Sequence, residues 1–258
     1  MDSIPMGKGL KTSDRIRGEL KSKGIRYWAG DNISEVVTDS DKKELIDELT
    51  EKFEGVLDTL LIDRDNDPNS MDTPRRLAKM YINEIMGGRY EAAPKLTAFP
   101  NDDPDSRYGG IIVTRSELIS MCSHHHQPVK GVAYIGLLAG VRVIGLSKYA
   151  RIAQWCASRG TLQEELTMSI ADELQKHTGT KDLAVYVQAT HGCMEHRGVL
   201  AHSSLTQTTE LEDNSLIHLL NKNFWIILRC NKYLQVQGLN QIKCSYGIGI
   251  YVLWWRIK

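Results

Sequence analysis

The chain has 258 residues, of which 41% are hydrophobic, so it is long enough to bury a sizeable core and is expected to be globular. Its 32 Lys and Arg residues balance 32 Asp and Glu residues, which excludes a general excess of positive charge as the basis for binding nucleic acid or an anionic membrane. The N-terminus lacks the apolar stretch of a signal peptide, and five cysteines disfavour a disulfide framework, so we expect a cytoplasmic protein whose cysteines are open to metal binding or catalysis.

The first segment of the chain, residues 1–30, is basic. It contains seven Lys or Arg residues against three acidic ones and shows no hydrophobic period. Such a composition is typical of a solvated arm, so we expect a basic extension whose order the sequence does not define.

Two helices are predicted in the next region, residues 31–98. A polar, capping cluster precedes apolar side chains that are spaced three or four residues apart as far as Leu60, which predicts one amphipathic helix. The pair Thr73-Pro74 has the pattern of a helix start, and Gly87-Gly88 has that of a helix end. A second helix is therefore predicted over residues 74–86.

Residues 99–211 change in character and are predicted to form a separate domain of strands and helices. Strands are predicted at residues 111–119, 132–144, 183–191 and 199–209, and a helical stretch, interrupted at Arg159-Gly160, at residues 148–177. Neighbouring strands of this order can pair as hairpins while the helices cover one face. We predict an α+β fold with an antiparallel four-stranded sheet and a helical pair between its second and third strands.

The C-terminal tail, residues 212–258, differs again. It has six Lys or Arg residues against two acids and holds three of the five tryptophans. Its apolar run at residues 246–255 is too short to span a bilayer. A structurally minor appendage, an oligomer or partner contact, and membrane-surface association through the tryptophans all remain open.

The strongest chemical signal is a pair of Cys and His clusters, one beginning at Cys122 and one at His191. Thiolate and imidazole are the ligands that zinc prefers, so both clusters are expected to contribute to one ion. If the strand at residues 183–191 continues, His191 and Cys193 lie on the same face, and the ion can draw on Cys122, His125 and Cys193.

The spacing leaves three interpretations open. Adding His196 to those three residues gives a closed Cys₂His₂ site with no place for water. Leaving it out gives a catalytic site with a free fourth position, and His124 and His191 then remain available as acid or base. In the third interpretation the histidines bind no metal.

Other segments favour an anionic substrate. Ser147, Lys148 and Arg151 lie together at a predicted helix start, where backbone N–H groups, the helix dipole and two cations favour a phosphate. Taken alone, the two basic residues also fit an ordinary solvated helix turn. The same choice between binding site and solvated surface applies to the residues Arg76, Lys79, Gln163 and Glu164. Arg197 follows the second Cys and His cluster directly.

Five segments, in this order and spacing, carry a resemblance to a known enzyme family. They are residues 72–81 (Asp-Thr-Pro-Arg-Arg-Leu-Ala-Lys-Met-Tyr), 122–125 (Cys-Ser-His-His), 143–152 (Val-Ile-Gly-Leu-Ser-Lys-Tyr-Ala-Arg-Ile), 163–164 (Gln-Glu) and 191–198 (His-Gly-Cys-Met-Glu-His-Arg-Gly). Over about residues 40–211 the sequence resembles GTP cyclohydrolase I. The resemblance implies the tunnelling fold, in which protomers join their sheets into a ring and two rings commonly stack as a homodecamer. It also implies hydrolysis of GTP to formate and 7,8-dihydroneopterin triphosphate, for pteridine or 7-deazaguanine synthesis.

The resemblance further implies catalytic roles for the matching residues. Cys122, His125 and Cys193 are the implied ligands of a Zn²⁺ ion that activates water for attack on C8 of the guanine. His191 and His124 are the implied proton carriers, and Ser147 assists the later rearrangement of the ribose.

Substrate binding is implied in the same way. Glu164 corresponds to the anchor of the guanine, because a carboxylate accepts from the ring N–H and the exocyclic amine together, and Gln163 is placed near the ribose. The implied triphosphate ligands are Lys148, Arg151, Arg197, Arg76 and Lys79. Because the family builds this pocket between subunits, Arg76 and Lys79 can serve the site of a neighbour.

The sequence departs from the family at three places. Ser123 stands where the family usually has Glu, which removes a carboxylate beside the metal ligands. The hairpin after His125 differs in length, and the tail is foreign to the pattern. These departures leave two alternatives: a related zinc enzyme acting on another purine nucleotide, and a catalytically silent oligomer that binds a nucleotide or regulates a partner through a closed zinc site.

Overall fold

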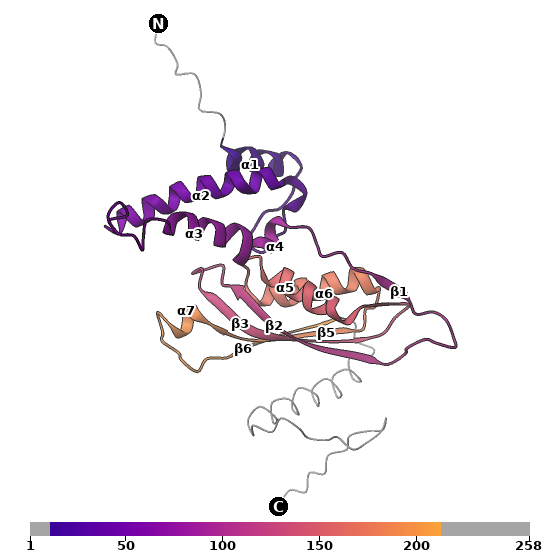
Figure 1. The fold of residues 1–258 in the computed structure, drawn as a ribbon. Helices are drawn as coiled ribbons and strands as arrows, with labels where there is room; N and C mark the ends of the chain where they lie inside the picture. The colour runs from indigo at the N-terminus through magenta and orange to yellow at the C-terminus, as the bar shows by residue number, and fades with distance from the viewer. Residues whose placement is uncertain (1–10, 213–258) are drawn as a thin grey trace, which may run out of the picture.

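The computed structural model describes residues 11–212 of the chain. Figure 1 shows an N-terminal group of helices that lies above a C-terminal group of strands and helices. The N-terminal group comprises α1 (Thr12–Ser22), η1 (Ser34–Val36), α2 (Asp39–Thr59), α3 (Thr73–Lys79), η2 (Met80–Ile85) and α4 (Gly87–Tyr90). The C-terminal group comprises β1 (Ala98–Pro100), β2 (Ile111–Met121), β3 (Pro128–Leu138), β4 (Arg142–Ile144), α5 (Leu146–Ala157), α6 (Gln163–Thr178), β5 (Leu183–His191), α7 (Gly192–Glu195) and β6 (Thr206–Glu212).

The main sheet is antiparallel and has the spatial order β2-β3-β5-β6. Its helical pair, α5 and α6, lies between the second and third strands in sequence, so the predicted α+β fold is confirmed. The register pairs Met121 with Pro128 and Val129 with His191. The ends of β2 and β5 therefore meet beside the start of β3, at one end of the sheet.

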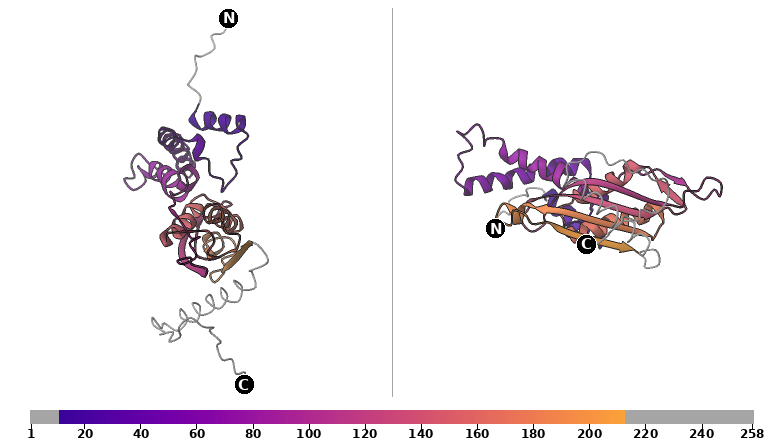
Figure 2. Two further views of the ribbon diagram at one scale, coloured as in Figure 1. Left: turned by 90° about the vertical axis from the view of Figure 1, so that its right-hand side faces the viewer. Right: turned by 90° about the horizontal axis from the view of Figure 1, so that it is seen from below.

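The helices α5 and α6 cover one face of the sheet, as the views of Figures 1 and 2 show. Aliphatic side chains from both layers interlock there: Val185 and Val187 of β5 belong to one core cluster with Ile152, Ile170 and Leu174, and each is at most 1% exposed. Burial of each such side chain contributes about 1.5–3 kcal/mol. This core fixes the start of α6 over the sheet.

The predicted helix that runs to Leu60 is confirmed as α2. It begins with a reciprocal capping box, in which the Thr38 hydroxyl accepts from the Asp41 backbone N–H and the Asp41 carboxylate accepts from the Thr38 backbone N–H. Both the cap and the apolar spacing of this helix are local properties, which is why the sequence predicted it.

The predicted second helix is present as α3, which continues into the π-helical turn η2. The helix ends at Ile85, close to the predicted end before Gly87-Gly88, and both glycines then begin α4. A Cβ atom on Gly88 would lie 2.2 Å from the backbone oxygen of Trp155 and 2.8 Å from that of Ser158. Gly88 is therefore needed for the close approach of α4 to α5.

The interpretation of residues 1–30 as a solvated arm is wrong for the part that holds α1. Ile16 and Leu20, four residues apart, are 4% and 2% exposed and pack with Ile33 and Val36. Two apolar residues are too few to give a hydrophobic period in a basic segment. Their burial depends on a partner that lies beyond residue 30 in the chain.

Two strand predictions needed correction at their ends. The strand predicted at residues 132–144 is divided into β3 and β4, and β4 pairs with β1 in a separate two-stranded sheet. The strand predicted at residues 199–209 begins only at Thr206, because residues 198–205 form turns. Among the helices described, none is long and apolar enough to cross a membrane. The tail predicted at residues 212–258 lies outside the described residues except for its first residue.

Candidate active site

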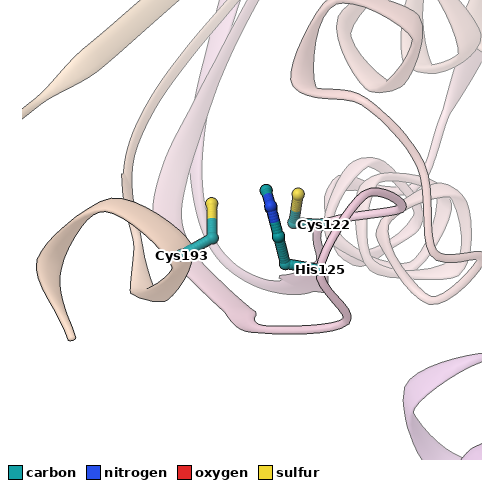
Figure 3. A group of neighbouring side chains, drawn as sticks. All are labelled: Cys122, His125 and Cys193. Carbon is teal, nitrogen blue, oxygen red and sulfur yellow. The ribbon is translucent and has the colours of Figure 1, made fainter. Parts of the chain in front are cut away.

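Three side chains converge where β2 and β5 end. Cys122 follows β2 directly, His125 lies in the turn that leads to β3, and Cys193 lies in α7 immediately after β5. Figure 3 shows the three side chains projecting into the same space from two separate segments. One ligand atom from each residue lies within 4.8 Å of the others. The sheet register is what brings the two segments together, because Val129 pairs with His191.

The donor set of this group fits a metal ion. Two thiols and one imidazole are the ligands of a zinc-type site, and three protein ligands leave a fourth position. Tetrahedral coordination with bonds of about 2.3 Å separates two sulfurs by about 3.8 Å, so the two thiols need to approach each other by at most about 1 Å. Burial, and next the hydrogen bond with Cys122, raise the pKa of the Cys193 thiol. A bound cation would oppose this effect, because a metal ion binds the deprotonated thiolate.

The condition that the strand continues beyond His191 is not met. The strand β5 ends at that residue, and the chain turns into α7, so the direction of Cys193 is set by a helical turn. His196, the fourth member of the closed Cys₂His₂ alternative, is exposed at the end of this turn. Within residues 11–212 the metal-binding group contains Cys122, His125 and Cys193 and does not contain His196.

His191 is held by a buried amide. Its Nε2 atom lies 2.7 Å from Oε1 of Gln163, whose side chain is 4% exposed. The amide nitrogen of Gln163 donates to the backbone oxygens of Val187 and Thr206, both at 3.2 Å. The two carbonyl acceptors fix the amide nitrogen, so Oε1 must face the ring and accept from Nε2–H. Neutral His191 then carries its hydrogen on Nε2 and has a free lone pair on Nδ1.

The environment of His191 favours this neutral form. Burial lowers the pKa of His191, and the carboxylates of Glu164 and Glu195 oppose this by a smaller amount. A neutral imidazole with one fixed nitrogen can accept a proton at the other. The expected position of Gln163 near a ribose did not suggest this contact, because nothing in the sequence places residue 163 beside residue 191.

A second contact that the sequence did not predict joins the turn at residues 122–127 to the N-terminal helices. His126 Nδ1 lies 3.3 Å from the hydroxyl of Tyr81 in η2, and the ring of Tyr81 stacks on Phe53 of α2. His126 has a φ of +50°, a conformation that is uncommon outside glycine. The turn that carries His125 is therefore held from outside the sheet.

The remaining predicted site residues lie in the turn between β2 and β3, on α6, after α7, on α5 and on α3. His124 is exposed in the turn at residues 122–127, and its ring meets that of His125 edge-on. Glu164 is exposed in the first turn of α6, and Arg197 follows α7. The others lie on α5 and α3: Ser147, Lys148, Arg151, Arg76 and Lys79.

Among residues 11–212, few of these cations have side-chain or backbone partners. Lys148 donates to the backbone oxygen of Lys95, and Arg76 forms an exposed ion pair with Asp72 at 3.6 Å. An exposed pair of this kind contributes little to stability, which leaves the cations of α3 and α5 available to an anion.

Comparison with known proteins adds independent findings. The family model described as GTP cyclohydrolase I matches residues 49–215, a range that includes every candidate site residue. The GTP cyclohydrolase 1 of Flavobacterium johnsoniae is 39% identical over 176 residues, which cover 67% of this chain and 76% of the relative. The protein of the same name from Aeromonas salmonicida is 36% identical over 197 residues, covering 76% and 86%. That of Aeromonas hydrophila is 41% identical over 166 residues, covering 62% and 75%.

Proposed function

This chain belongs to the GTP cyclohydrolase I family, and from that premise we propose the residues by which it hydrolyses GTP at C8 to formate and 7,8-dihydroneopterin triphosphate. The observation that carries the proposal is the convergence of Cys122, His125 and Cys193 at one end of the sheet. His191, with its fixed ring, lies two residues from Cys193 and completes the reactive set.

We propose Zn²⁺ as the ion that these three ligands hold. When bound, zinc supplies a Lewis acid that lowers the pKa of a water ligand to near neutrality. The chain is proposed to leave the fourth position open, since the group comprises three ligands within residues 11–212, and it contributes the burial of Cys122, which is 6% exposed.

His191 is proposed to move the protons that ring opening requires. Attack of water at C8 requires a proton on the imidazole ring nitrogen of the guanine, and the Nδ1 atom of His191 can take and return one while Gln163 holds Nε2–H. His124, exposed in the same turn as His125, is the proposed second proton carrier. Ser147 is proposed to assist the ribose rearrangement that follows.

Substrate recognition is assigned to the surrounding charges. The exposed carboxylate of Glu164 is proposed to accept two hydrogen bonds from the guanine edge, a pattern that adenine does not offer. The proposed ligands of the triphosphate are Lys148, Arg151, Arg197, Arg76 and Lys79. Gln163 is proposed to position His191, in place of a direct contact with ribose.

We further propose that the enzyme works in the cytoplasm as a homo-oligomer, with a decamer as the assembly to test. The four-stranded sheet has β2 and β6 at its edges, and edge strands can pair with those of another copy. Arg76 and Lys79 lie on α3, outside the sheet domain, which is consistent with service to the site of a neighbour.

The test is formate release from GTP by zinc-loaded protein, with the fluorescence of the oxidised pterin followed in parallel. Cys193→Ala should lose both bound zinc and formate release, and His191→Ala should keep the zinc and lose formate release. His196→Ala is the matched control and should keep both. Loss of zinc from His196→Ala, or full formate release by His191→Ala, would contradict the assignment. Turnover confined to a nucleotide other than GTP would support the alternative substrate.

A further inference from the structure

A pocket that is separate from the candidate active site lies between the segment before η1 and one face of α6. Its volume is about 310 Å³, at the lower end of the range for small-molecule sites. None of the candidate active-site residues lines it. Its walls include Gly30 and Asn32 on one side and Glu165, Ser169 and Asp172 on the other.

The backbone builds this pocket closely. Gly30 has a φ of +86°, and a Cβ atom there would lie 2.5 Å from the Thr161 hydroxyl oxygen. Only glycine allows both the left-handed conformation and the close approach. The segment is fixed further by the Arg26–Asp31 ion pair and by Asn32, which donates to the backbone oxygens of Gly88 and Glu91.

The unusual member of the lining is Arg159. It is 7% exposed, and its Nε atom is buried without a hydrogen-bond partner. Its other nitrogens reach only the Gly30 oxygen at 3.5 Å and the Cys156 sulfur at 3.7 Å, and its guanidinium stacks on Trp155. No carboxylate in residues 11–212 forms an ion pair with it. A buried, uncompensated guanidinium is costly, so an anionic group is expected to complete this site.

The other charges of the lining indicate that a ligand with only negative charge would not match this pocket. Arg26 pairs with Asp31, and Lys176 pairs with Glu173 at 2.7 Å. After these internal pairs, the lining keeps one cation, Arg159, and two carboxylates, Glu165 and Asp172. The carboxylate of Glu165 accepts from the Thr161 hydroxyl and lies in the electrostatic field of Arg26, but within residues 11–212 it forms no ion pair.

We infer that this pocket binds a free basic amino acid, with its carboxylate on Arg159 and its two cationic nitrogens toward Glu165 and Asp172. A ligand with one carboxylate and two ammonium groups balances the one cation and two carboxylates that the lining leaves. The carboxylates lie seven residues apart on α6, about 10 Å along the helix, so an extended side chain suits them better than a compact one.

Calorimetric titration of the full chain with L-lysine tests the inference. L-lysine should bind saturably, whereas cadaverine, which has no carboxylate, and acetate, which has no cation, should bind at least about tenfold more weakly. Saturable binding of inorganic phosphate in place of L-lysine would overturn the inference, and so would no L-lysine binding up to about 10 mM.

Two variants locate the ligand. Arg159→Met should weaken L-lysine binding by about 10- to 100-fold, since it removes charge-assisted hydrogen bonds. Because Arg159 is buried and its variant can fail to fold, Asp172→Asn on the exposed wall provides a second test and should weaken binding by about tenfold. Asp102→Asn, which neutralises an exposed carboxylate of the β1–β2 loop, is the matched control and should bind normally. Normal binding by Asp172→Asn would refute this placement.

Discussion

The contact between Gln163 and His191 is the part of the candidate site that substitution can test most directly. Gln163→Leu keeps a buried side chain of similar size, but it removes the acceptor for His191 Nε2–H and the two N–H donors to the sheet. We expect the variant to bind zinc, to be less stable, and to release formate from GTP more slowly.

The expected loss of stability follows from the hydrogen bonds. An amide nitrogen has two hydrogens, so its bonds to Val187, Thr206 and the Thr208 hydroxyl count as two at any time. At about 1 kcal/mol net for each bond, and about 1 kcal/mol for the bond to His191, the loss is about 3 kcal/mol. Formate release should fall by about 10- to 100-fold, because His191 loses the group that fixes its protonated nitrogen.

A second variant separates positioning from stability. Gln163→Glu keeps an acceptor for the His191 ring but cannot donate to the two backbone oxygens, so it should be at least as destabilised as Gln163→Leu and yet release formate faster. Gln175→Leu, the same change elsewhere on α6, is the control. Urea unfolding at one protein concentration gives the stability, and formate and bound zinc are measured on the same samples. If both Gln163 variants lose formate release in proportion to stability, the positioning role is wrong.

Three further predictions concern the helices around the site: the cap of α2, the contact of α4 with α5, and a buried cysteine of α5. Burial raises the pKa of Asp41, but hydrogen bonds from Thr38 and the charge of Arg15 outweigh it and leave the pKa below the usual 3.8. The stability that the ionised carboxylate contributes is therefore present above that pH and is lost as the pH falls below it. Asp41→Asn should cost about 1 kcal/mol at pH 7, and a series of urea midpoints against pH should show a weaker fall on the acid side for this variant. Gly88→Ala should destabilise by about 1–3 kcal/mol in the same assay, whereas Gly55→Ala, which meets nothing within 4 Å, should not. Burial raises the pKa of Cys156 to about 12, so iodoacetamide at pH 8 should label Cys156 only after unfolding. Rapid labelling of Cys156 in the native enzyme would refute its burial.

Much of the fold is local information, and the sequence predicted that part. The α2 helix follows from its cap and its apolar spacing, and the strands β2 and β5 follow from runs of β-favouring residues. The sequence was less informative where an element depends on a distant partner. The helix α1 needs Ile33 and Val36 to bury its two apolar residues, and the glycine at position 88 is required by the backbone of α5.

The candidate site likewise has a part that the sequence predicted and a part that depends on contacts between distant residues. The sequence by itself determined which side chains are candidates for metal and proton chemistry, because Cys and His clusters and basic helix turns are visible in the order of residues. Only the tertiary structure decided which of them meet: the register of β3 against β5 brings Cys193 to Cys122, and the turn into α7 leaves His196 outside the group. It also decided the contact of Gln163 with His191, because that contact depends on how α6 packs across the sheet, and side-chain contacts across layers leave no periodic signal in the chain.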